Sequence, residues 1–139
     1  MAEFSITHSY AAPPERVFDA WLDPAIARRF LFATPTGEMI RAEVDARVGG
    51  KFTFVDRRPD MGDVLHTGEY QKVDRPRRLA FTFGVPQFNP DFSRIEVEIA
   101  PTATGCDLTL TQSDVPDEWA DRSKQGWTMI LGWLAAALA

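Results

Sequence analysis

The fold of this chain is decided by residues 39–54, which read MIRAEVDARVGGKFTF. Apolar and polar residues alternate along the first ten positions, and this period of two predicts a half-buried β-strand. The side chains expected on its inner face are those of Ile40, Ala42, Val44, Ala46 and Val48. Gly49-Gly50 is typical of a tight hairpin, and Phe52 and Phe54 continue the apolar face on a returning strand. The stretch therefore predicts an antiparallel pair of strands with one buried face.

The same period of two recurs elsewhere in the chain. Apolar and polar residues alternate in the five segments 4–10, 64–73, 79–83, 95–99 and 106–111. Stretches that contain Pro, Gly, Asn or Asp separate most of these segments, as expected for turns. Together with the pair described above, the pattern predicts seven strands, six of them consecutive.

Three segments carry the period of an α-helix instead. Pro13-Pro14 suits the first turn of a short helix, where a missing N–H has no consequence, and Asp23-Pro24 ends that helix and begins a second one. Pro116 opens the last helical segment. Its apolar stripe has helical spacing and consists of Trp127, Ile130, Leu131, Leu134 and Leu138.

The predicted order of elements is one strand, two short helices, six strands and one long helix. We therefore expect an α+β fold in which a curved antiparallel sheet of about seven strands wraps around the long C-terminal helix. That helix is the only element long enough to cover the apolar face of the sheet. Because a strongly curved sheet around a helix leaves more interior than side chains easily fill, we expect a cavity between them.

Length and composition restrict the function classes. At 139 residues the chain fits one domain, 1–139, and a hydrophobic fraction of 45% favours a folded globular protein. The net charge of −5 disfavours binding to phosphate backbones, so no nucleic-acid partner is expected. The longest apolar run, residues 129–139, is too short to span a bilayer, and no signal peptide is evident. We expect no membrane insertion and a cytoplasmic location.

The sequence carries no motif for a cofactor or a metal. Cys106 is the single cysteine, which excludes an internal disulfide and a cysteine metal cluster, and we interpret it as a small buried hydrophobe on a strand. Gly49-Gly50 is interpreted as a turn and not as a phosphate-binding loop. No Gly-x-Ser-x-Gly segment indicates an esterase. We therefore expect neither a cofactor nor a metal ion.

Five short motifs, combined with this order of elements, resemble a known family. They are DARVGGKF at 45–52, GEY at 68–70, DRPRRL at 74–79, FTF at 81–83 and QGW at 125–127. The chain resembles, from about Phe4 to Leu138, the family related to the activator of the heat-shock-protein-90 ATPase, homologue 1. That family belongs to the START-like (SRPBCC, helix-grip) superfamily, which includes lipid-transfer domains, polyketide cyclases and plant hormone-binding proteins.

The resemblance implies a helix-grip fold with a ligand cavity, but it does not transfer a ligand. Many family members have a Trp-rich end to the second short helix, where this chain has Arg28-Arg29-Phe30-Leu31-Phe32. This region usually borders the mouth of the cavity. The founding activator engages the chaperone with an additional N-terminal domain, and we expect no such domain within these 139 residues.

Two polar residues are candidates for chemistry in the interior. His66 shares the parity of Gly68 and Tyr70, and an inward-facing histidine can act as an acid, a base or a hydrogen-bonding group. Asp56 has the inward parity of Phe52 and Phe54 and would form an acid–base pair with His66 if their strands are neighbours. Alternatively, His66 is a structural histidine that bonds a backbone carbonyl. His8 is expected to be exposed on the first strand.

A larger, mostly aromatic set is expected to line the cavity and bind a ligand. Its members are Trp21, Phe30, Phe52, Phe54, His66, Tyr70, Phe81, Phe83, Trp127 and Leu131. Aromatic residues at strand or helix spacing can equally form an ordinary core. The two interpretations overlap, because a cavity in this fold is lined by core-like residues. Trp133 lies off the helical stripe and could reach the cavity or a partner surface.

Three functions are compatible with these features. The first is binding of a small hydrophobic or amphipathic ligand between the sheet and the C-terminal helix. The second is an enzyme of cyclase or hydrolase type that uses His66 with Asp56, although an enzyme is the less favoured class. The third is a chaperone- or stress-response-related interaction protein that acts through its surface. A fold alone does not choose among them.

Overall fold

The computed structural model describes residues 1–139 and shows seven strands in one antiparallel sheet, in the order β1-β7-β6-β5-β4-β3-β2. The strands are β1 (Ala2–Tyr10), β2 (Glu38–Val44), β3 (Lys51–Arg58), β4 (Gly62–Asp74), β5 (Arg78–Phe83), β6 (Ser93–Pro101) and β7 (Cys106–Val115). The helices are α1 (Pro14–Leu22), α2 (Pro24–Ala27), the 3-10 turn η1 (Asp117–Trp119) and α3 (Ala120–Leu138). The predicted α+β fold and its order of elements are confirmed.

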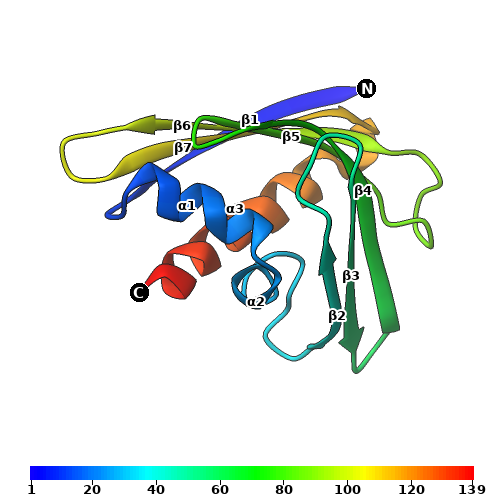
Figure 1. Ribbon diagram of the computed structural model, residues 1–139. Coiled ribbons are helices and arrows are strands. Elements are labelled where there is room, and N and C mark those ends of the chain that lie inside the picture. Colours follow the sequence, from blue (N-terminus) through cyan, green and yellow to red (C-terminus); the bar gives the residue numbers. More distant parts are fainter.

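The sheet bends sharply, and the helices lie on its concave side (Figure 1). Strands β2, β3 and β4 form a wing that turns away from the rest of the sheet. At the bend β4 passes so close to β5 that a Cβ on Gly68 would lie 1.8 Å from the carbonyl oxygen of Thr82. Only glycine fits there without a backbone shift. The bend leaves room between the wing and α3.

The long helix α3 is the cover that the apolar face of the sheet requires. All five residues of its predicted stripe are buried, from Trp127 to Leu138. Trp21 of α1 is fully buried beside it, with its ring 6.3 Å from that of Trp127 and the two planes 26° apart. Strand β1 also holds the helix, because the Tyr10 hydroxyl donates to the Leu131 carbonyl at 2.7 Å. Burial raises the pKa of Tyr10 above its ordinary value.

The segment 39–54 differs from its prediction in two details. Strand β2 ends at Val44, and residues 45–50 form a loop, so the Val48 side chain is 63% exposed and not on the inner face. The register of β2 also shifts between Met39 and Arg41. As a result Met39 is buried and Ile40 is 39% exposed, the reverse of the expected parity.

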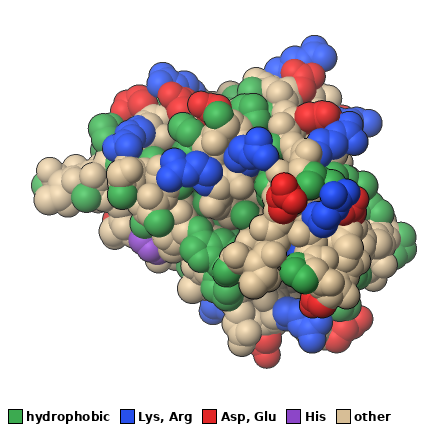
Figure 2. Space-filling view, turned by 90° about the horizontal axis from the view of Figure 1, so that it is seen from below, with side chains coloured by type: hydrophobic (Ala, Val, Ile, Leu, Met, Phe, Trp, Pro, Cys, Tyr) green, Lys and Arg blue, Asp and Glu red, His purple; other side chains and the backbone are tan.

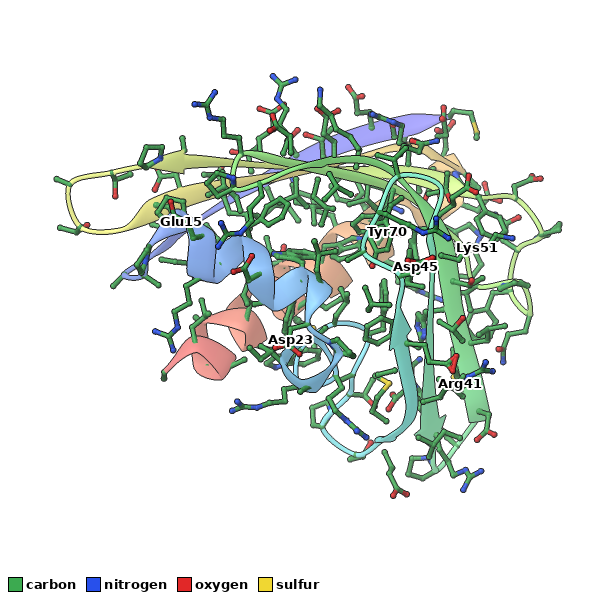
Figure 3. The ribbon with its side chains drawn as sticks, in the orientation of Figure 1. Glu15, Asp23, Arg41, Asp45, Lys51 and Tyr70 are labelled. Carbon is green, nitrogen blue, oxygen red and sulfur yellow. The ribbon has the colours of Figure 1, made fainter.

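The loop 45–50 is fastened to β4 and not closed as a tight hairpin. The Gly49 amide donates to the Tyr70 carbonyl and the Tyr70 amide donates to the Gly50 carbonyl, both at 2.9 Å. Asp45 of this loop lies near Tyr70 (Figure 3), and burial together with the Asp45 charge raises the pKa of the Tyr70 phenol.

Charged side chains of both signs are interspersed on the face seen in Figure 2. Several form exposed ion pairs, such as Arg41 with Glu43 and Arg75 with Asp19, and these pairs lower the pKa of the two carboxyl groups. No helix is long and apolar enough to cross a lipid bilayer.

Candidate functional site

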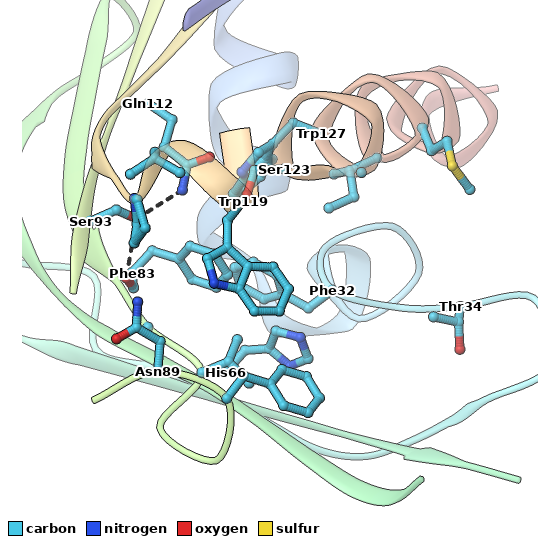
Figure 4. Close-up of a pocket in the computed structure, with 18 of the residues that line it drawn as sticks. Phe32, Thr34, His66, Phe83, Asn89, Ser93, Gln112, Trp119, Ser123 and Trp127 are labelled. Atoms are coloured by element: carbon cyan, nitrogen blue, oxygen red, sulfur yellow. Dashed lines mark hydrogen bonds between the residues drawn. The ribbon is translucent and has the colours of Figure 1, made fainter. Parts of the chain in front are cut away.

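A cavity of about 340 Å³ lies between the wing of the sheet and α3. Its walls come from the loop after α2, from strands β3 to β7, from the loop between β5 and β6, and from η1 and α3 (Figure 4). Small-molecule sites in proteins have volumes of roughly 300–1,000 Å³, so this cavity can hold a compact organic ligand.

One wall of the cavity is a set of parallel rings. The ring centroid of Phe32 lies 4.6 Å from that of His66 and 4.9 Å from that of Phe83, with planes 11° and 6° apart. His66 and Phe83 are themselves parallel within 6°. The indole of Trp127 stands at 75° to Phe83 and 71° to Phe32, 5.7 Å from each. Phe32 therefore stacks on both His66 and Phe83, and the indole of Trp127 is set across this group of rings.

A buried carboxylate holds the loop that supplies Phe32. Asp56 of β3 is fully buried, and its Oδ2 accepts a hydrogen bond from Thr34 Oγ1 at 2.8 Å. The same oxygen accepts one from Arg58 Nε at 3.0 Å. Gly37 permits this approach, since a Cβ there would lie 2.6 Å from both carboxylate oxygens. The loop is thereby tied to the wing of the sheet.

His66 is neutral at pH 7 in this setting. The side chain is buried, and burial is the main reason that the pKa of its imidazole falls to about 4. The nearby Arg58 charge lowers this pKa further, whereas the Asp56 charge opposes the shift. Nδ1 of His66 has no hydrogen-bond partner. The ring is therefore a flat, uncharged part of the wall.

The strands of Asp56 and His66 are neighbours, which the hypothesis of an acid–base pair requires. In their register His66 lies opposite Phe54, and Asp56 lies opposite Val64. No hydrogen bond joins Asp56 to His66: Thr34 and Arg58 both bind Oδ2 of the carboxylate, and neither Oδ1 of Asp56 nor Nδ1 of His66 has a partner. The structure thus brings the two side chains into one region of the site and gives Asp56 other partners.

A second polar group lies on β7. Gln112 is only 3% exposed; its Nε2 donates to Ser93 Oγ at 2.8 Å, and Ser93 Oγ donates to the Phe83 carbonyl at 3.3 Å (Figure 4). Oε1 of Gln112 has no partner. Its sequence signal was the inward parity that it shares with Leu108 and Leu110. Because alternation often lapses at the end of a strand, that signal alone did not place it in a site.

Few charged groups line the cavity. Arg58 is bound to Asp56, while Asp91 and Asp114 lie at exposed positions of the rim. No cluster of three or more His, Cys, Asp or Glu side chains could hold a metal ion. Cys106 is buried in the core, and its pKa is raised chiefly by burial and also by Asp107 and Glu15, which disfavours a reactive thiolate.

The structure brings three of the ten predicted ligand-binding residues to the cavity, namely His66, Phe83 and Trp127. Four others, Trp21, Phe52, Tyr70 and Phe81, surround a second interior region that is too tightly filled to hold a water molecule. The remaining three, Phe30, Phe54 and Leu131, are fully buried in the core. His8 is half-buried on β1 and stacks on Tyr10 at 4.4 Å.

Several lining residues were not in the predicted set of ten ligand-binding residues. Phe32, Phe88 and Asn89 come from loops, where no periodic pattern marks a buried side chain. Trp119 comes from η1, and Met129 and Trp133 from the side of α3 that the apolar stripe does not include. For Trp133 the departure from the stripe was a usable signal, and the residue does reach the cavity.

Comparisons with known proteins agree with this geometry. A family model described as "Activator of Hsp90 ATPase homolog 1-like protein" matches residues 11–139, as the sequence motifs predicted. The solved structure of a protein from Chromobacterium violaceum is 27% identical, with a TM-score of 0.88 over 98% of this chain and 96% of that one. A structure from Nitrosomonas europaea is 20% identical, with a TM-score of 0.83 over 98% and 93% of the two chains, and shows the fold alone. No curated protein is similar enough to match.

Proposed function

Because the chain belongs to the family of Activator of Hsp90 ATPase homolog 1-like proteins, with the START-like helix-grip fold, we propose that it binds a small hydrophobic or amphipathic molecule in the cavity between the sheet and α3. The observation that carries this proposal is the cavity itself, about 340 Å³ in volume, with the rings of Phe32, Phe83 and Trp127 in its lining. A concave site of this volume, lined in large part by apolar side chains, is the usual form of a small-molecule site in proteins.

The expected affinity follows from the apolar surface that a ligand would bury. Removing about 300 Å² of apolar surface from water, counted on ligand and wall together, contributes roughly 7 kcal/mol at ~25 cal/mol per Å². The lost freedom of the ligand offsets part of this gain. Dissociation constants from micromolar to millimolar are therefore expected for a simple apolar probe.

The contacts favour binding over acid–base catalysis. A general base needs a partner that orients it or raises its basicity, and His66 has a lowered pKa and no hydrogen bond to Asp56. Asp56 in turn is occupied in holding the loop of Phe32. Both groups are better explained as parts of the cavity wall and its support.

Two glycines of α3 allow a matched test of where a ligand binds. A Cβ at Gly126, which lines the cavity, or at Gly132, which does not, would meet no atom within 4 Å. Gly126→Leu should therefore fill part of the cavity from a position where its Cβ has room, and Gly132→Leu is the control with the same change in helix propensity.

The experiment combines native mass spectrometry of the purified protein with thermal-shift titrations of 1-decanol, decanoate and 2-naphthol. We expect at least one compound to raise the melting temperature of the wild type and of Gly132→Leu, but not that of Gly126→Leu. The proposal is wrong if no compound stabilises the wild type and no small molecule co-purifies. It is also wrong if Gly126→Leu binds as well as the control.

A further inference from the structure

We propose that the ligand of this cavity is an amphipathic carboxylate, with its apolar body between the wing and α3 and its carboxylate bound to the terminal nitrogens of Arg58. This inference rests on the proposed function and specifies its ligand class. It depends on three features of Arg58, namely its place on the inner face of β3, its unused hydrogen-bond donors and the charge that it brings to the cavity.

The place of Arg58 is the first feature. Alternate residues of β3 face the concave side of the sheet, and Arg58 follows Phe52, Phe54 and Asp56 in this series. Its partner across the ladder to β4 is Gly62, which has no side chain to cover it. Arg58 is the only lysine or arginine that lines the cavity, and its side chain is 20% exposed. The side chain is therefore open to a ligand.

The unused donors are the second feature. Nε of Arg58 donates to Oδ2 of Asp56 at 3.0 Å, and no hydrogen bond engages Nη1 or Nη2. Neither Nη is among the buried atoms that lack a partner, so both are accessible. Asp56 is fully buried and is also held by Thr34, so it fixes the direction of the guanidinium. A guanidinium held through Nε keeps its two Nη groups free to bind both oxygens of a carboxylate.

The charge is the third feature. Burial chiefly, and then the Arg58 charge, lower the pKa of His66 to about 4, and the opposing effect of the Asp56 charge is smaller. The pair thus produces a positive potential at His66, which lines the cavity. Asp91 and Asp114 are exposed at the rim, where water and salt screen their charges. An anionic group is therefore favoured beside Arg58.

The rest of the lining suits an apolar body. Phe83, Phe88, Met129 and Trp133 line the cavity, and each keeps accessible surface. An alkyl chain or a ring can contact these side chains while the fully buried rings of the core stay packed. One charged group in an otherwise largely apolar site is the arrangement that orients an amphipathic molecule.

Isothermal titration calorimetry compares three probes with the same number of carbon atoms, at pH 7 and below their critical micelle concentrations. They are decanoate, 1-decanol, which lacks the charge, and decylammonium, which reverses it. We expect decanoate to bind the wild type about tenfold more tightly than 1-decanol, in line with a charge-assisted hydrogen bond, and decylammonium to bind most weakly. Gly126→Leu should weaken decanoate and 1-decanol alike, because both chains would occupy the cavity.

The variant Arg58→Gln removes the charge and keeps an N–H donor for Asp56. Arg57→Gln is the matched control, because Arg57 lies on the opposite face of β3, does not line the cavity and pairs with Asp63. We expect Arg58→Gln to bind decanoate about tenfold more weakly and 1-decanol as before, with Arg57→Gln behaving as the wild type. Circular dichroism verifies the fold of each variant. If Arg58→Gln does not fold, the ranking of the three probes on the wild type still decides.

Three results would overturn the inference while leaving the proposed function intact. One is binding of 1-decanol as tight as that of decanoate. Another is an unchanged affinity for decanoate in a folded Arg58→Gln variant. The third is tighter binding of decylammonium than of decanoate, which would assign the head group to the carboxylates of the rim. Binding of none of the three probes would overturn the inference, and it would count against the proposed function as well if 2-naphthol also fails to stabilise the protein.

Discussion

The phenyl ring of Phe32 is stacked on the imidazole of His66, with centroids 4.6 Å apart and planes 11° apart. The two rings come from different parts of the chain, since Phe32 lies in the loop after α2 and His66 on β4. Phe32 has φ 60°, a left-handed conformation that a bulky residue rarely adopts. Its ring contacts, together with the bond from Thr34 to Asp56, compensate this strain.

Phe32→Ala should show how much this contact stabilises the protein. Phe32 is buried, so we expect its truncation to lower the free energy of unfolding by about 3–5 kcal/mol, the usual range for a buried phenylalanine. Phe88 also lines the cavity but is 48% exposed, so Phe88→Ala is the control and should change stability little. Urea titration measures both, and similar losses in the two variants would contradict the prediction.

Asp56→Asn tests the support of the loop. Removing the charge leaves Arg58 without its partner in a mostly buried position, and breaking such a pair destabilises a protein by roughly 3–5 kcal/mol. The neighbouring pair Arg57 with Asp63 is exposed, so Asp63→Asn should leave the unfolding midpoint nearly unchanged. Urea denaturation at pH 7 compares the variants. Equal midpoints for Asp56→Asn and the wild type would show that the carboxylate does not hold the loop.

His66 should make stability depend on pH in a defined window. Its pKa is lowered from 6.5 to about 4 on folding, so the unfolded chain takes up the proton first as the pH falls. The contribution of His66 to the free energy of unfolding is fully present above pH 6.5. It is lost as the pH falls from about 6.5 to 4, and the loss reaches about 3 kcal/mol at 1.36 kcal/mol per pKa unit. Arg58 favours and Asp56 opposes this shift.

His66→Phe removes the titrating group and keeps a ring that can stack. We expect the stability of the wild type relative to His66→Phe to fall by about 3 kcal/mol between pH 7 and pH 4, measured by urea denaturation at several pH values. Carboxyl groups with lowered pKa values, such as Asp19 and Glu96, titrate in both proteins and cancel in the difference. Parallel pH profiles would mean that His66 is not desolvated in the folded state.

The sequence predicted the sheet and the long helix because their periods report burial directly. The alternation along β6 and β7 shows that one face of the sheet must be covered, and the apolar stripe of α3 shows the same for one face of the helix. Packing the helix on the sheet covers both apolar faces. The same logic failed at β2, where a register shift near Ile40 exchanges the buried parity. A shift of this kind leaves no mark in a pattern of apolar and polar residues.

Much of the site could not be predicted, because it depends on how loops fold back onto the sheet. Phe32 reaches the cavity through a left-handed backbone, and Oδ2 of Asp56 accepts a hydrogen bond from Thr34, which is 22 positions away in a loop. Neither contact has a local signal. Gln112 had one, since a polar residue of inward parity needs a partner, but only the structure shows that its Oε1 has none.

Gly126 and Gly132 weaken α3 in a way that substitution can reverse. Both lie in the interior of the helix, where glycine is less stable than alanine by about 0.5–1 kcal/mol, and a Cβ at either position meets no atom within 4 Å. Gly126→Ala and Gly132→Ala should each raise the free energy of unfolding by that amount. The two sites are about 9 Å apart along the helix axis at 1.5 Å per residue, so the double variant should show nearly the sum. Thermal and urea denaturation of the four proteins measure this, and a loss of stability in Gly126→Ala alone would show that the cavity side of α3 requires a glycine for close packing.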